Sequence, residues 1–193
     1  MTTETSRCIA AHIASFCPGR RTDEFTWSVG PIRASLPNFR VQRLAPRDEG
    51  EPWAYVTIGG AETSESVGAG KEFLLISPFE TPRHIETLAM LAHFNSLPQH
   101  RIDIGEVIKT GRPWLEGSGC DWLYMSVPYT VPREFQYCTT HDGGTVRFLW
   151  AVPVYASEAA YIRSSGAEAF ERSLEQSAVN VLDPNRPVVA PVQ

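Results

Sequence analysis

The sequence has few lysines and no long hydrophobic run. Only two of its 17 basic residues are lysine, and its net charge is −5. An acidic chain does not suit nucleic-acid binding, because neutralising phosphates requires a basic surface. No apolar run approaches the roughly 18 residues of a membrane-spanning helix. The N-terminus also lacks a basic stretch followed by an apolar one, so we expect a cytoplasmic protein that binds neither nucleic acid nor membrane.

Cysteine is also scarce, and the four cysteines lack the spacing of a metal site and the density of a disulfide scaffold. Buried free thiols are the simplest interpretation. The spacing leaves open a bridge between Cys8 and Cys17 or between Cys120 and Cys138.

Motifs of common catalytic and cofactor sites are absent. Gly68, Gly70 and Lys71 resemble part of a phosphate loop, but Glu72 stands where that motif needs Ser or Thr. No HExxH zinc motif or GxSxG nucleophile elbow occurs. The sequence therefore predicts no cofactor and no enzymatic activity.

One group of reactive residues leaves an alternative open. Cys138, His141 and Asp142 lie together at a predicted turn, where two or three ligands are too few for a metal site. A cysteine-dependent hydrolase using Cys120 or Cys138 with His141 would need a lowered thiol pKa and a base brought close by the fold. We keep it as the alternative from the enzyme class.

The composition is that of one globular domain. The chain has 193 residues, of which 42% are hydrophobic and 20% charged, and this length suits a single core. We expect one domain over 1–193, with 1–4 and 188–193 frayed.

Hydrophobic periodicity predicts strands grouped together, with helices between them and at both ends. Helices are expected over 5–16 and 81–96, strands over 25–32, 39–46, 53–60, 71–78 and 122–129, and a hairpin around 141–144. The Gly- and Ser-rich segment 59–70 is predicted to be a mobile loop or a wide hairpin. This pattern indicates an α+β fold, with a mixed, largely antiparallel sheet and flanking helices.

The segment 146–187 is the one around which the fold is expected to form. Its apolar start, centred on Trp150, is typical of a central strand buried on both faces. Pro153 is predicted to end that strand. Ser157 and Ser165 are predicted to cap two helices, the second with Glu168 in a capping box.

This segment carries a family resemblance. FLWAVPVYASEAAYI (148–162), LDPNRP (182–187) and IDIGEVIKTGRPWLEGSGCDWLYMSVPY (102–129) together resemble the suppressor-of-fused domain in its bacterial form. They cover about half of the chain, and the first hundred residues show little of the pattern. The resemblance implies a single suppressor-of-fused-like domain that binds proteins. Bacterial members of the family often look like immunity proteins of secreted toxin systems.

Four residues are candidates for a partner-binding surface, because aromatic residues and arginine dominate protein interfaces. Trp114 lies in a predicted loop with Arg112 beside it, and its side chain is a candidate for exposure. Tyr129 and Arg133 form a second pair of the same kind. The alternative for each is a loop residue that packs back on its own domain.

We therefore expect an immunity protein whose acidic surface complements a basic toxin domain. A cytoplasmic regulator or adaptor with the same fold is the alternative from the binding class.

Overall fold

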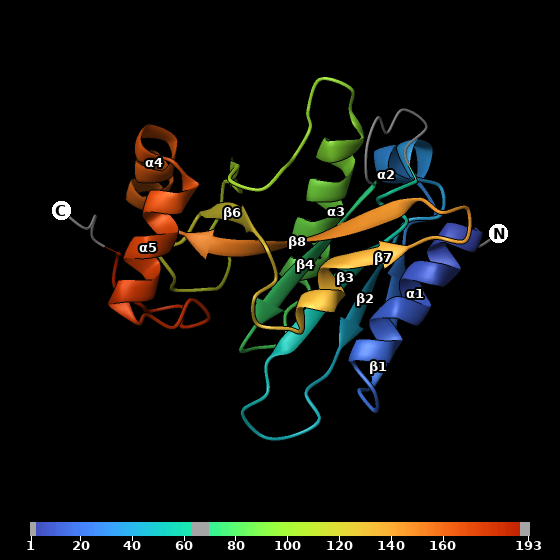
Figure 1. Cartoon of the computed structure of the whole chain (residues 1–193), viewed down its shortest axis with the longest axis horizontal. Coiled ribbons are helices and arrows are strands. Elements are labelled where there is room, and N and C mark those ends of the chain that lie inside the picture. The colour runs from blue at the N-terminus through green and yellow to red at the C-terminus, as the bar shows by residue number, and fades with distance from the viewer. Residues whose placement is uncertain (1–2, 63–69, 190–193) are drawn as a thin grey trace. The chain divides into compact units, whose positions relative to one another are not determined.

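The computed structural model describes residues 3–62 and 70–189, which form two compact units (Figure 1). The first unit comprises residues 1–102 and 127–150, and the second comprises residues 103–126 and 151–193. Strand β8 (Thr145–Val154) contributes to both, since the boundary follows Trp150. Among the described residues, no helix has the length and apolarity needed to cross a membrane.

The first unit is built on a mixed sheet in which the strands run β1-β2-β3-β4-β8. Neighbouring strands are antiparallel except β4 and β8, which are parallel, and β7 pairs antiparallel with β8. The other strands are β1 (Thr22–Thr26), β2 (Arg40–Leu44), β3 (Trp53–Ile58), β4 (Gly70–Ser77) and β7 (Tyr137–Thr139). The strand predicted over 71–78 is confirmed as β4, and it lies between β3 and β8.

Helices pack against this sheet through the apolar faces that periodicity predicts. Helix α1 (Glu4–Phe16) lies against β3, β7 and the short 3-10 helix η1 (Arg133–Gln136), and buries Ile9 and Ile13 completely. The ring of His12 stacks on Phe148 of β8, with ring centroids 5.5 Å apart. Helix α3 (Arg83–Ser96) packs on β2, β3 and β4. The helix predicted over 81–96 is thus confirmed, and it buries Ile85, Leu88 and Ala92.

The second unit contains β5 (Val107–Lys109), β6 (Trp122–Ser126), the end of β8, and helices α4 (Ala156–Ser165) and α5 (Ala167–Ser177). Strands β5 and β6 are antiparallel, and β6 neighbours β8. Phe170 of α5 is fully buried and packs edge-on against Tyr124 of β6. The Tyr124 hydroxyl donates a 2.6 Å hydrogen bond to Glu171. Together the units have the predicted α+β fold.

Two predicted element boundaries are wrong. The strand expected over 25–32 ends at Thr26, and a short helix, α2 (Gly30–Ser35), begins where alternation had indicated strand. Pro31 lies in its first turn, where a missing N–H costs nothing and the fixed φ suits a helix. Pro153 does not end β8, because the strand continues to Val154. The carbonyl oxygen of Pro153 accepts a 3.1 Å hydrogen bond from Arg186.

The helix caps also differ from expectation. Helix α4 begins one residue before Ser157, and α5 begins after Gly166, so neither predicted serine is the N-cap. Gly166 has φ 89°, a conformation that favours glycine and separates the two helices. Near the ends of the described residues, Thr3 caps α1 and Val189 is buried. The predicted loop over 59–70 falls mainly on 63–69, outside the described residues.

A buried ion pair in the second unit joins two of the motifs that carry the family resemblance. Arg186 of LDPNRP meets Glu158 of the SEAAYI segment in a two-pronged contact, with N–O distances of 2.7 and 2.6 Å. Both side chains are almost completely buried, at 1% and 0% exposure. Glu158 also accepts from the backbone N–H groups of Tyr155 and Val189. Burying two charges is tolerated only with such complete pairing, so this pair fixes the C-terminal segment on α4.

Replacing one partner of this pair should be costly. We expect Arg186→Met to lower the free energy of unfolding by about 3–5 kcal/mol, because it leaves the Glu158 carboxylate buried and unpaired. Urea denaturation measures the change. Arg47→Ala is the matched control, since the Arg47–Glu51 pair is half exposed and should contribute about 0.5 kcal/mol or less. Equal losses of unfolding free energy in the two variants would show that the buried pair stabilises the fold no more than the exposed one.

Candidate functional site

A pocket in the first unit contains one of the two predicted residue pairs. It is lined by Val127, Pro128, Tyr129, Val131, Arg133 and Gln136, encloses about 410 Å³, and is called here the Tyr129 pocket. The residues come from one segment of ten, folded into successive tight turns. The N–H of Tyr129 donates to Val127 O at 2.9 Å, and that of Val131 donates to Pro128 O at 3.3 Å. The prolines at 128 and 132 restrict the backbone further, so the pocket is largely preformed.

Tyr129 is an exposed aromatic side chain with a fixed base. It is 54% exposed, and its ring packs edge-on against Trp150 of β8, with centroids 4.7 Å apart. Trp150 itself is completely buried, as predicted for the central strand. A ring held in this way loses little conformational entropy when a partner covers it, which favours tyrosine as a binding anchor.

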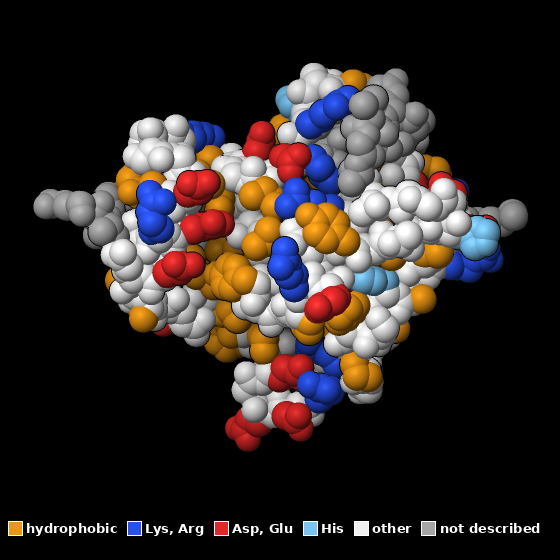
Figure 2. Space-filling model, in the orientation of Figure 1, with side chains coloured by type: hydrophobic (Ala, Val, Ile, Leu, Met, Phe, Trp, Pro, Cys, Tyr) orange, Lys and Arg blue, Asp and Glu red, His pale blue; other side chains and the backbone are white. Residues whose placement is uncertain are grey.

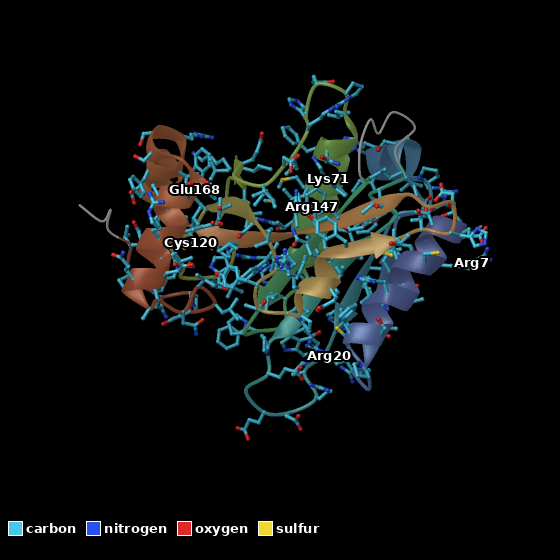
Figure 3. All side chains as sticks on the ribbon, viewed as in Figure 1. Arg7, Arg20, Lys71, Cys120, Arg147 and Glu168 are labelled. Atoms are coloured by element: carbon cyan, nitrogen blue, oxygen red, sulfur yellow. The ribbon has the colours of Figure 1, made fainter. Side chains whose placement is uncertain are left out.

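Arginines accompany the aromatic residues on this surface. Arg133 is exposed at the start of η1, and within the described residues it forms no ion pair. Arg147 of β8 lies over the ring of Tyr137, 5.5 Å from its centroid, and Tyr137 is 48% exposed. The Gln136 amide oxygen, when turned toward Arg147, accepts from its Nη2 and Nε at 3.1 and 3.3 Å. Figure 2 shows hydrophobic and basic side chains side by side over the middle of β8. Figure 3 places Arg147 beside Lys71, its cross-strand neighbour on β4.

The other predicted pair is not arranged as expected. Trp114 is only 5% exposed, so its predicted exposure is wrong. Its indole N–H donates to the Ser118 hydroxyl at 3.1 Å, and its backbone N–H donates to Cys120 O at 3.0 Å. The loop thus folds back on itself, which the residue types alone did not reveal. Arg112 is exposed. Trp114 and Arg112 belong to the second unit and Tyr129 and Arg133 to the first.

The reactive residues of the hydrolase alternative are not poised for nucleophilic chemistry. All four cysteines have free thiols. Burial raises the pKa of the Cys138 thiol, and its sulfur contacts Thr139 O at 3.8 Å. His141 is largely exposed and faces Glu4 at 3.9 Å. Asp142 accepts from Thr140 and the Gly144 N–H, and the Thr140 hydrogen bond lowers its pKa. These contacts make a hairpin turn. No cluster of three or more metal-ligating side chains occurs within 3–62 and 70–189.

Buried thiols with raised pKa values should react slowly. Burial also raises the pKa of Cys120, so we expect iodoacetamide at neutral pH to leave Cys120 and Cys138 unmodified in the native protein, because little thiolate is present and access is restricted. Peptide mass spectrometry after labelling in urea, where all four thiols should react, is the control. Rapid native labelling of Cys138 would restore the hydrolase hypothesis.

A buried carboxylate on β4 is the main titratable group that sequence reasoning missed. Glu72 is completely buried, and its carboxylate accepts from the Thr57 hydroxyl and from the N–H groups of Gly59, Gly60 and Ala61, the last three at 2.9–3.2 Å. Burial raises the pKa of Glu72 from 4.5 to about 7, and the four hydrogen bonds oppose that shift. Glu72 therefore holds the end of β3 against β4 without a cationic partner among these donors.

Because its pKa is higher in the folded state, Glu72 stabilises the fold most at low pH. Its contribution should fall as the pH rises from about 4.5 through about 7, by up to about 3 kcal/mol in total. We expect the unfolding free energy of the wild type to decline relative to Glu72→Gln across this range. Urea titrations at several pH values measure the difference. Glu49→Gln, at an exposed turn, should leave the pH dependence of the unfolding free energy unchanged. If the wild type and Glu72→Gln show the same pH dependence, the raised pKa of Glu72 is contradicted.

These features define a class, an α+β domain with a preformed aromatic pocket. Sequence comparison then gives the family: the model of "Suppressor of fused protein (SUFU)" matches residues 36–187, and the chain belongs to this family. The match reaches well into the first hundred residues, where the motifs had shown little resemblance. No curated protein matches the chain significantly.

Solved structures agree with this membership. A SUFU homologue from Neisseria gonorrhoeae is 33% identical, with a TM-score of 0.86 and 98% of each chain covered. A Sufu–Fu complex matches with 15% identity and a TM-score of 0.67, over 91% of this chain and 86% of that one. Drosophila Suppressor of Fused matches with 14% identity and a TM-score of 0.71, over 91% of this chain and 47% of its own. The last two likenesses show the fold alone.

Proposed function

We propose that this chain is a non-enzymatic protein-binding domain that holds its partner at the Tyr129 pocket. The observation that carries the proposal is the pocket itself, where a half-exposed tyrosine packed on Trp150 lies beside an exposed arginine that forms no ion pair with any described residue. Tyrosine and arginine are the residue types that contribute most to protein interfaces. A distant relative with this fold is described in a Sufu–Fu complex, which supports protein binding as a use of the fold.

The partner we propose is a bacterial toxin domain, which makes this chain an immunity protein acting in the cytoplasm. Its net charge of −5 suits a basic partner, because opposite net charges raise the rate of association. A regulator or adaptor of the same fold is the alternative, and it would bind a partner that is not toxic.

A toxicity-rescue assay tests both the toxin partner and the Tyr129 pocket. The candidate toxin is the product of the gene next to the one that encodes this chain. We expect co-expression to relieve toxicity and the two proteins to co-purify. Tyr129→Ala and Arg133→Ala should each weaken binding about tenfold or more, since loss of a central interface residue costs about 1–2 kcal/mol or more.

Matched variants separate the pocket from general surface effects. Phe79→Ala removes another exposed aromatic residue of the first unit, 59% exposed, and Arg7→Ala removes an exposed arginine on α1. Both should rescue like the wild type. Full rescue by the two pocket variants would exclude the Tyr129 pocket, and loss of rescue in Arg112→Ala alone would move the site to the second unit. Co-purification with a non-toxic product would favour the adaptor.

A further inference from the structure

We infer that the Tyr129 pocket recognises a peptide segment of its partner in which an apolar side chain stands next to an acidic one. The apolar side chain would lie against Tyr129 and the valines, and the carboxylate would pair with Arg133. This inference rests on the proposed function and specifies the chemistry of the bound segment.

The apolar half of the recognition follows from the lining. Val127, Pro128 and Val131 supply hydrocarbon surface, and Tyr129 supplies an aromatic face. The volume of about 410 Å³ falls within the range of about 300–1,000 Å³ in which compact ligands bind. Burying one leucine-sized side chain against this lining removes apolar surface from water and favours binding. The short turns and the two prolines mean that little of this gain is lost in ordering the pocket.

The acidic half follows from the local charge. The lining contains one charged residue, Arg133, and no carboxylate. Within the described residues Arg133 forms no ion pair, so its guanidinium remains available for a partner. Next to the pocket, Gln136 faces a second guanidinium, that of Arg147. A basic side chain placed here would meet like charge, whereas a carboxylate matches the planar donor pairs of arginine.

The local charge is opposite to that of the whole chain. The protein carries −5 overall, which attracts a basic partner over long range, but charge pairing within the pocket acts over a few ångströms. The two levels are compatible, because a basic domain can present an acidic residue at one position. Such a pairing would also fix the register of the partner and exclude segments with lysine there.

Short synthetic peptides test this recognition directly. The probes are fluorescent peptides, acetylated and amidated at their ends, in which Leu or Phe stands next to Glu, and matched peptides in which that Glu is Gln or Lys. Fluorescence anisotropy measures binding to the full chain. We expect the Glu peptides to bind about tenfold more tightly than the Gln peptides, because a hydrogen bond to a charged acceptor is stronger than one to a neutral amide, and the preference should shrink at high salt.

Variants of the pocket make the test specific. Arg133→Glu should reverse the preference, so that the Lys peptides bind better than the Glu peptides, and Arg133→Lys should retain part of it. Tyr129→Ala should weaken every peptide. Arg7→Glu, at a site on α1 that Figure 3 shows away from Arg147, is the charge-matched control and should behave like the wild type. Unchanged urea midpoints would establish that each variant is folded.

Several results would overturn the inference. Equal binding of the Glu and Gln peptides would remove the role of Arg133. Binding only of peptides with a free C-terminal carboxylate would assign a different ligand, and binding of no peptide would show that the pocket does not take a peptide segment. If rescue by the whole protein still depends on Tyr129 in these cases, the proposed function stands and only the peptide chemistry is wrong. Loss of that dependence would remove both.

Discussion

The burial of β8 is the constraint on which the rest of the structure depends. From Val146 to Val154 only Arg147 escapes full burial. Every backbone donor and acceptor of such a strand must find a partner away from water. Parallel pairing with β4 and antiparallel pairing with β7 supply partners in the first unit, and β6 is the neighbour of β8 in the second. The side chains require cover as well, which His12 of α1 supplies for Phe148.

The proposed binding site depends on the same strand. The ring of Tyr129 can remain half exposed and still be fixed because its inner edge rests on Trp150. A buried tryptophan in a central strand is among the most rigid supports that a protein offers, because dense packing on all sides opposes its displacement. Because Trp150 is held rigidly, the ring of Tyr129 has a fixed position at the surface, and binding there requires little reorganisation.

Two buried carboxylates are compensated in different ways for their loss of hydration. Glu158 meets the guanidinium of Arg186, so charge neutralises charge. Glu72 instead meets the Thr57 hydroxyl and three backbone N–H groups, and burial raises its pKa to about 7. Hydrogen bonds from neutral donors compensate desolvation less completely than an opposite charge does. The first arrangement holds the C-terminal segment on α4, and the second makes the junction of β3 and β4 sensitive to pH.

Local pattern was enough to predict much of the fold. The run around Trp150, the Asp-Gly turn before β8 and the periodicity of α1 and α3 are local signals, and each led to the correct element. Pairing over long distances was not accessible in this way, because Glu72, Glu158 and Arg186 are ordinary polar residues until the fold brings their partners close. Trp114 and Tyr129 illustrate the limit most clearly. Both are aromatic residues in turn-rich segments near an arginine, yet one folds back onto Ser118 and the other projects from Trp150. The sequence by itself determined the class of fold and the family motifs, since these depend on periodicity and local turn chemistry. Only the tertiary structure decided which aromatic residue reaches the surface, because exposure is a property of what packs around a side chain.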